Sequence, residues 1–282
     1  MRRVLLIISI LLPLCCCTKK AIVPADPDVI DDGRTEVRAS IADYAGSAFI
    51  WQPSSRIGIY DSEGRENVRY TLQGSYAGKD GEVSLYGPTI GGSLVAYYPY
   101  SSKGYRCVAD HRQPVLAEQV AGASASQHLA LNAVLVAEAG DDGRFLFSYE
   151  GGNTGLLHLS LNCPVEGPVR KVVIHCPGAP LAGSVSLSAE ADPLVSDGSH
   201  YLTLTEVGRP CTASAPLEVW GQVPAGRYEH LTITVFSAEG SATASIAGPV
   251  NVPAGGSADA SAGSAPSDAS NEDLTIIDGT YE

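Results

Sequence analysis

The sequence predicts an all-β protein that carries two successive sets of short strands behind an export signal. Valine, threonine, tyrosine and leucine recur in short runs that Gly, Pro, Asp and Ser interrupt, which is typical of strands joined by turns. Glycine (30 residues) and proline (18 residues) are frequent, methionine occurs once, and no long amphipathic helical pattern is present. Two successive sets of strands favour two β-sandwich domains in tandem.

The first 17 residues, MRRVLLIISILLPLCCC, have the form of a secretory signal that ends at a lipid-attachment site. Their apolar run of eleven residues contains Pro13 and is too short for a membrane-spanning helix, which needs about 20 residues. We expect residues 1–16 to be the signal peptide and Cys17 to be acylated, because Cys16 precedes it and Leu14 lies three positions before it. The alternative is that all three cysteines belong to a cleaved leader.

The charge of the chain excludes nucleic acid as a partner. Removal of residues 1–16 leaves 266 residues and changes the formal charge from −13 to −15, since Arg2 and Arg3 are lost. A chain this acidic has no basic footprint for nucleic acid, and anionic lipid would repel it. We therefore expect the outer membrane to hold the protein only through its acyl chains, such as palmitate, with the folded part at the cell surface.

The chain then divides into a tether and a first strand set. Residues 17–34 are polar, acidic and proline-containing, and we interpret them as a lipidated flexible tether or propeptide. From Thr35 the sequence alternates, with Val37, Ala39 and Ile41 on one side of a predicted strand. The N-terminal β-sandwich is predicted over residues 35–162. Its further strands are predicted at 56–60, 69–72, 82–85, 92–98, 129–137, 143–149 and 155–161.

A second strand set and a tail complete the chain. The C-terminal β-sandwich is predicted over residues 163–252, with strands at 169–175, 183–188, 200–204, 215–221, 230–237 and 242–247. Residues 253–282 are predicted as a disordered linker followed by a short C-terminal strand, because 253–273 lacks large apolar side chains. As a random coil these 21 residues span roughly 25 Å, so the apolar segment 274–277 can reach a neighbouring copy.

No motif indicates an enzyme, a cofactor or a metal. The sequence lacks a G-x-S-x-G elbow, an H-E-x-x-H motif, a phosphate-binding glycine loop and a CxxC pair. His158, Cys163, His175 and Cys176 do not have the spacing of a zinc site. We therefore predict no catalytic residue, no cofactor and no metal ligand.

The cysteines and aromatic residues leave alternatives open. Cys163 and Cys176 end adjacent predicted strands and could form a disulfide in an exported protein, but small buried thiols are an equal alternative. A group of tyrosines could stack on sugars or pack in a core, and the two tryptophans share this ambiguity. These aromatic residues are Tyr86, Tyr97, Tyr98, Tyr100, Tyr105, Trp51 and Trp220.

Three stretches resemble the fimbrillin family of pilus proteins of Bacteroidota. Phe49-Ile50-Trp51 followed by residues 56–61 (RIGIYD) is similar to the family's tryptophan and "D-x-I-G-V-Y" motif, with Arg56 in place of the acidic residue. Residues 95–101 (VAYYPYS) are similar to its "AYYPY" strand, and residues 231–256 to its closing hairpin. The similarity covers residues 35–258.

This resemblance implies two transthyretin-like Greek-key β-sandwiches, export as a lipoprotein and assembly into fimbriae. In the family's stalk subunits an arginine-specific protease removes an N-terminal segment, and a neighbour's strand fills the groove left behind. Mapped onto this sequence, Arg34 and Arg38 become candidate cleavage positions, with ordinary surface arginines as the alternative. The donor strand would be the tail, with Leu274 and Ile276 entering the groove.

Together these features predict a non-enzymatic fimbrial subunit that supports adhesion and associates with other fimbrial subunits at the cell surface. Stalk, tip and anchor roles remain open at this point. The alternative is a monomeric surface lipoprotein that binds a glycan or a host ligand through its tyrosines.

Overall fold

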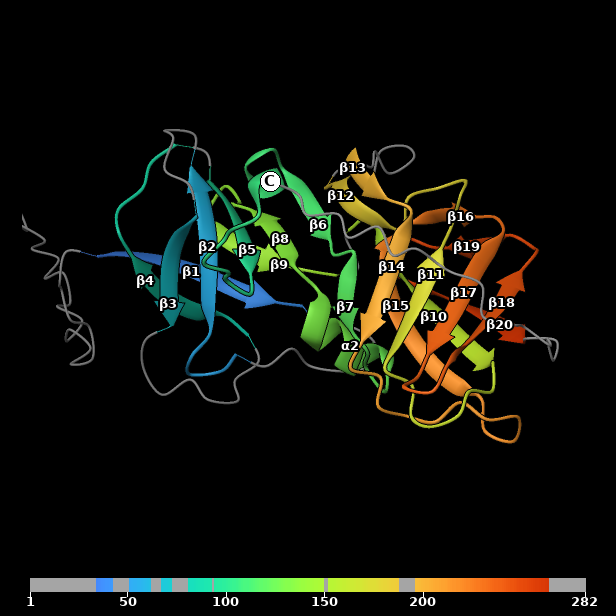
Figure 1. Ribbon diagram of the computed structural model, residues 1–282. Helices are drawn as coiled ribbons and strands as arrows, with labels where there is room; N and C mark the ends of the chain where they lie inside the picture. The colour runs from blue at the N-terminus through green and yellow to red at the C-terminus, as the bar shows by residue number, and fades with distance from the viewer. Residues whose placement is uncertain are drawn as a thin grey trace, which may run out of the picture. The chain divides into compact units, whose positions relative to one another are not determined.

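The computed structural model describes residues 34–42, 51–61, 67–72, 81–92, 94–149, 152–187 and 196–263. Within these ranges the chain forms twenty strands and two short helices (Figure 1). The all-β prediction is therefore confirmed. No helix in the described ranges is long and apolar enough to cross a membrane.

The first sheet has seven strands in the spatial order β8-β5-β2-β3-β4-β1-β9 (Figure 1). Its strands are Thr35–Ile41 (β1), Arg56–Asp61 (β2), Val68–Leu72 (β3), Val83–Gly87 (β4), Leu94–Tyr98 (β5), Leu135–Glu138 (β8) and Arg144–Phe147 (β9). Six of the seven strands were expected from alternation, within a few residues at the ends. Side chains from all seven share one buried cluster, so the sheet curls around its own core.

A second pair of sheets encloses another core. A three-stranded sheet, β15-β10-β20, and a five-stranded sheet, β18-β17-β11-β14-β7, contribute to one buried cluster. This is a β-sandwich, in which alternate residues of each strand point inward. The strands of the two sheets are Glu118–Val120 (β7), Thr154–Asn162 (β10), Lys171–His175 (β11), Tyr201–Thr205 (β14), Leu217–Pro224 (β15), Leu231–Phe236 (β17), Ser241–Ile246 (β18) and Ser257–Gly263 (β20).

The remaining elements are short. A three-stranded sheet has the order β13-β12-β6, and β16 pairs with β19. Their bounds are Arg112–Val115 (β6), Ala182–Ser186 (β12), Ser196–Ser199 (β13), Gly226–Tyr228 (β16) and Val250–Val252 (β19), and the helices are Arg106–Ala109 (α1) and Ala125–Asn132 (α2).

Helix α2 differs from the sequence prediction, which placed a strand over residues 129–137. The helix covers the first four of those residues, and β8 covers residues 135–138. Ser124 caps the helix, since its Oγ accepts a hydrogen bond from the backbone N–H of Gln127 at 3.3 Å. The serine cap begins the helix, and the hydrogen bonds of His128 to Gln119 and of Asn132 to Val120 hold it against β7.

Two elements differ from the predicted division of the chain. Strand β10 was assigned to residues 35–162, but it pairs with β15 and β20, and Leu157, Leu159 and Leu161 belong to the sandwich core. Residues 257–263 were assigned to a disordered linker, but they form β20, parallel to β10. Small residues are sufficient there, because only Ala262 of β20 is buried and the ladder of backbone hydrogen bonds supplies the pairing.

A buried polar network joins α2 and β7 to β15. His128 is fully buried, and its Nε2 lies 2.8 Å from Oε1 of Gln119, while its Nδ1 lies 3.3 Å from Nδ2 of Asn132. The amide of Gln119 also donates to the carbonyl of Gln222 at 2.7 Å, and the Gln222 backbone N–H donates to Gln119 Oε1 at 2.9 Å. The Gln222 backbone N–H also lies 3.2 Å from Nε2 of His128. Each ring nitrogen therefore has an N–H donor beside it, which fits a neutral imidazole, because a doubly protonated ring has no nitrogen left to accept.

Burial lowers the pKa of His128 to about 4. Its removal from water penalises the charged ring, and this effect outweighs a backbone hydrogen bond at Val120 that raises the pKa. The network is therefore complete only while His128 is neutral.

Candidate functional site

Strand β1 and the residue before it form the first candidate site. Arg34 is exposed and directly precedes β1, whereas Arg38 lies inside the strand. In the register of the sheet Arg38 faces Ser84 on β4 and Arg144 on β9, so its backbone has a partner strand on both sides. Of the two arginines predicted as cleavage positions, only Arg34 lies outside a strand.

The inward face of β1 is buried. Val37, Ala39 and Ile41 are each no more than 7% exposed and belong to the core of the first sheet. On the outer face Arg38 and Arg144 both contact Glu82, with nitrogen–oxygen distances of 3.5 Å and 3.0 Å. These charges are about 40% exposed, so the ion pairs contribute at most about 1 kcal/mol. Apolar burial and strand pairing hold β1 in place.

Strand β20 is the last described element of the chain. Asp259 on β20 contacts Nδ1 of His158 at 2.8 Å, and Glu218 on β15 contacts Nε2 of the same ring at 3.0 Å. The His158 ring also stacks on Trp220, with centroids 3.9 Å apart. Asp259 is 83% exposed, so its ion pair adds little to the pairing of β20.

The tyrosines of the AYYPY stretch lie in or against cores. Tyr97 is fully buried and contacts the rings of Tyr60, Tyr100 and Tyr105. Its hydroxyl donates to Asn67 and lies 2.9 Å from the carbonyl oxygen of Ser101. Burial raises the pKa of Tyr97 well above its usual range, so the phenol stays protonated.

The other aromatic residues also contribute to packing. Tyr98 is half-buried, with the Trp51 ring 5.2 Å away in an edge-on arrangement and the Phe147 ring 6.3 Å away. Trp51 is fully buried, and its indole N–H donates to the carbonyl of Gly81 at 3.1 Å. Trp51 is therefore part of the core of the first sheet, and Tyr98 packs against that core.

Cys163, Cys176 and Cys211 of the sandwich are buried thiols, and the structure does not join Cys163 to Cys176 by the disulfide that we considered. The backbone N–H of Cys163 instead points to the sulfur of Cys211 at 3.4 Å, and the thiol of Cys176 donates to the carbonyl of Glu229 at 3.4 Å. His175 stacks on Tyr201 at 4.3 Å. Among the described residues no group of three His, Cys, Asp or Glu side chains could hold a metal ion.

Three predicted functional residues lie outside the described residues. They are the lipidation site Cys17 and the donor-strand residues Leu274 and Ile276. Their roles stay predictions.

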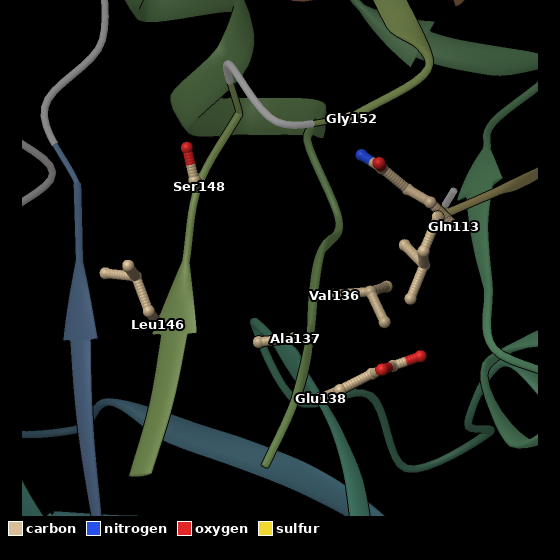
Figure 2. A pocket seen from close by; sticks show the side chains of 8 residues that line it. Gln113, Val136, Ala137, Glu138, Leu146, Ser148 and Gly152 are labelled. Carbon is tan, nitrogen blue, oxygen red and sulfur yellow. The ribbon is translucent and has the colours of Figure 1, made fainter. Parts of the chain in front are cut away.

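The sequence analysis missed a cavity of about 400 Å³ beside β8 and β9 (Figure 2). It is lined by Gln113, Val136, Ala137, Glu138, Leu146, Ser148, Gly152 and Leu187. Leu146 is 62% exposed although both its neighbours are buried phenylalanines. The one signal in the sequence was Leu146 itself, an apolar residue at an outward position of β9. Its two phenylalanine neighbours make the stretch look uniformly apolar, so the outward position is hard to recognise.

Comparisons with solved structures found adhesion and fimbrial proteins, while no family model and no curated protein sequence matches the chain. A candidate cell adhesion protein from Bacteroides ovatus has 16% identity and a TM-score of 0.45, over 80% of this chain and 91% of that one. A candidate cell adhesion protein from Bacteroides thetaiotaomicron has 12% identity and a TM-score of 0.33, with the same two coverages. The tip fimbrial protein Mfa3 from Porphyromonas gingivalis has 13% identity and a TM-score of 0.29, over 75% and 82%.

Proposed function

We propose that this chain is a structural subunit of a surface fimbria, joined to other subunits by insertion of a β-strand from one copy into the next. It is exported as a lipoprotein acylated at Cys17 and has no catalytic role. The observation that carries this proposal is the position of β1, an N-terminal strand between two partner strands directly behind an exposed arginine.

Strand β1 has the properties of a replaceable strand. It pairs antiparallel with β4 and parallel with β9, and its apolar side chains cover the sheet core. Without β1, the sheet would have a slot with unpaired backbone groups on both sides and an apolar floor. An extended, alternating segment from a neighbour is the ligand that such a slot binds.

The positions of the arginines favour a subunit that keeps its own β1. Such a subunit takes part in strand insertion as the donor, through its tail, and does not offer the β1 slot itself. Cleavage after Arg34 removes the tether and leaves β1 complete, whereas cleavage after Arg38 requires the strand to open first. The sequence has no arginine between Arg38 and Arg56, which is the first residue of β2. An arginine-specific protease could therefore separate an intact β1 from the rest of the chain only by cutting within β2. We therefore propose a tip, anchor or accessory role rather than a stalk role.

Deletion of residues 264–282 tests the assembly. We expect laddered oligomers to disappear from extracts of the cell surface, because the donor segment is lost. A sharper version replaces Leu274 and Ile276 by serine, with Thr275→Ser as the control, since position 275 points to the opposite side of a strand. Unchanged ladders in both the deletion and the double variant would remove the donor role from the tail.

Labelling with a radioactive fatty acid tests the anchor. We expect Cys17→Ser to abolish labelling and membrane retention, while Cys15→Ser leaves both unchanged. Continued labelling of the Cys17→Ser chain would assign the lipid to Cys15 or Cys16.

A further inference from the structure

The cavity beside β8 and β9, which we call the β8–β9 cavity, contains a buried amide donor without a partner. Gln113 on β6 is only 2% exposed, yet its Nε2 makes no hydrogen bond to any of the described residues. The other buried side-chain amides among those residues all donate a hydrogen bond, and they are Gln119, Asn132, Asn153 and Gln222. The unpaired donor of Gln113 is therefore an exception within the described chain.

Neighbouring residues hold Gln113 in place and leave space for its carboxamide. Its backbone pairs with Val185 on β12, and Figure 2 shows its carboxamide pointing toward Gly152. A Cβ at position 152 would lie 2.7 Å from Gln113 Oε1, so a larger residue there would crowd the carboxamide. A buried donor without an acceptor is unfavourable, and a ligand that accepts its hydrogen bond removes that penalty.

The rest of the cavity combines a few polar groups with apolar side chains. Glu138 on β8 and Ser148 after β9 supply a carboxylate and a hydroxyl. The lining residues with branched apolar side chains are Val136, Leu146 and Leu187. A volume of about 400 Å³ lies within the range of about 300–1,000 Å³ that small-molecule sites occupy, and such sites place a few polar groups among apolar ones.

The polar groups restrict the charge of a ligand. Oε1 of Glu138 contacts Nδ1 of His111 at 2.6 Å, and a carboxylate has further acceptor sites, so Glu138 can also accept from a ligand. No lysine, arginine or histidine is among the described lining residues, so Glu138 repels an anion there. An ammonium group could pair with Glu138, but it has no acceptor for the amide of Gln113. A ligand that satisfies both residues is neutral and carries donors and acceptors close together.

We propose that the β8–β9 cavity binds a neutral sugar unit, a pyranose ring without an acidic or basic substituent. Each hydroxyl of the ring can donate and accept, so one hydroxyl can accept from Gln113 while another donates to Glu138. The C–H groups of the ring would pack on Leu146 and Leu187. This inference goes beyond the assembly of a fimbria, since none of the described lining residues belongs to β1.

A sugar fits this cavity better than a peptide does. An added peptide strand gains its affinity from a run of main-chain hydrogen bonds along a strand edge. Strands β8 and β9 each have only four residues, and they bridge to each other at Ala139 and Phe145, so the edge that they offer is short. The unpaired donor is a side-chain amide, which a compact ring of hydroxyls can reach without an extended backbone.

Titration with simple glycosides tests the proposal. The full-length chain, in a detergent without a sugar head group, is titrated with the methyl glycosides of glucose, galactose and mannose, and binding is followed by saturation-transfer NMR and calorimetry. We expect at least one of the three to bind with a dissociation constant on the order of 1 mM, which is ordinary for a ligand of about a dozen non-hydrogen atoms. No binding of any of them at about ten times that concentration would overturn the proposal.

Two further comparisons locate the site. Gln113→Leu should weaken binding about ten-fold through loss of the amide hydrogen bond. Leucine has a similar size and removes the unpaired donor, so thermal unfolding should show no loss of stability. Leu146→Asp should weaken binding several-fold, whereas Leu131→Asp should not, because Leu131 is also exposed (52%) but lies on α2. Undiminished binding to Gln113→Leu, or equal effects of the two aspartate variants, would overturn the proposal.

The carboxylate of Glu138 predicts a preference for uncharged rings. We expect the wild type to bind the glycoside about ten-fold more tightly than its uronic acid counterpart, which carries a carboxylate on the ring. Glu138→Gln should narrow that difference several-fold, because the repulsion is removed. An equal preference in wild type and variant would show that Glu138 does not face the ligand and would overturn the proposed site.

Two other outcomes would assign the cavity a different occupant. Binding of acetyl-trialanine amide that depends on Gln113, without binding of any glycoside, would make the cavity a peptide site. Loss of laddered oligomers from cells that carry Gln113→Leu would make it an assembly site. Either result would overturn the sugar proposal, and neither decides whether the tail acts as a donor strand.

Discussion

At the scale of single residues, a glycine determines how the AYYPY strand packs. Gly58 on β2 faces Tyr97 on β5, and the Tyr97 ring lies across the glycine. A Cβ placed at position 58 would lie 2.1 Å from Cε1 of that ring. The added atom would meet a fully buried aromatic ring. The Tyr97 hydroxyl donates to Asn67 and accepts from the backbone N–H of Ser101 at 3.2 Å, so the ring has little freedom to move away.

We therefore expect Gly58→Ala to lower the free energy of unfolding by about 2–3 kcal/mol through overpacking. The control is Gly248→Ala, because a Cβ there would meet no atom within 4 Å. That control should change stability by less than about 0.5 kcal/mol. Urea unfolding followed by tyrosine fluorescence measures both, and equal effects of the two variants would contradict the packing of Tyr97 on Gly58.

At the scale of elements, the pairing of β1 makes the backbone at Arg34 and the backbone at Arg38 differ in their accessibility to proteases. A protease needs an extended, accessible backbone, which Arg34 offers outside the strand and Arg38 does not. We expect limited digestion of the folded chain by an arginine-specific protease to produce a new N-terminus at Thr35, identified by N-terminal sequencing. Arg34→Gln should prevent that product, whereas Arg38→Gln should not.

A new N-terminus at Ala39 in the folded chain would show that β1 opens readily. It would then favour a stalk role, because the sheet could lose part of β1 after export.

Strand β20 lies within the segment that was predicted as a disordered linker. It covers one edge of β10 through seven register pairs and buries Ala262 against the sandwich core. We expect deletion of residues 257–282 to lower the free energy of unfolding by several kcal/mol, because β10 then exposes its edge. Deletion of 264–282 should leave stability nearly unchanged. Equal unfolding midpoints for both deletions would contradict a structural role for β20.

At the scale of the whole molecule, the network around His128 makes stability depend on pH. Its folded-state pKa is about 4, and the unfolded value is about 6.5. The unfolded chain therefore binds the proton more tightly, so stability from this residue is complete above pH 6.5 and is lost as the pH falls toward 4. A shift of this size corresponds to about 3 kcal/mol.

His128→Gln provides the test. The variant cannot titrate, so we expect its free energy of unfolding to fall less between pH 7 and pH 4.5 than that of the wild type. Denaturant unfolding at the two pH values gives the change in the free energy of unfolding for each chain. Titration of carboxylates contributes equally to both chains, so the difference between them reports on His128. The same pH dependence in both would show that His128 is not held in its neutral form.

The alternation of apolar and polar residues determined most of the strands. Val37, Ala39 and Ile41 are buried as predicted, because a strand with one face on a core follows a period of two. Helix α2 and strand β20 were not predicted, for opposite reasons. The helix gains much of its stability from buried polar contacts with distant residues, and β20 is held by a backbone ladder that small side chains do not reveal.

Local composition and periodicity were sufficient to predict the all-β class and the short strands with their buried faces. The tertiary structure decided which strands are neighbours, and thus that β1 lies between β4 and β9 and that β8 and β9 separate. It also decided that Gln113 is directed into a cavity and that His128 is neutral. These properties depend on contacts between residues far apart in the chain, which no local pattern records.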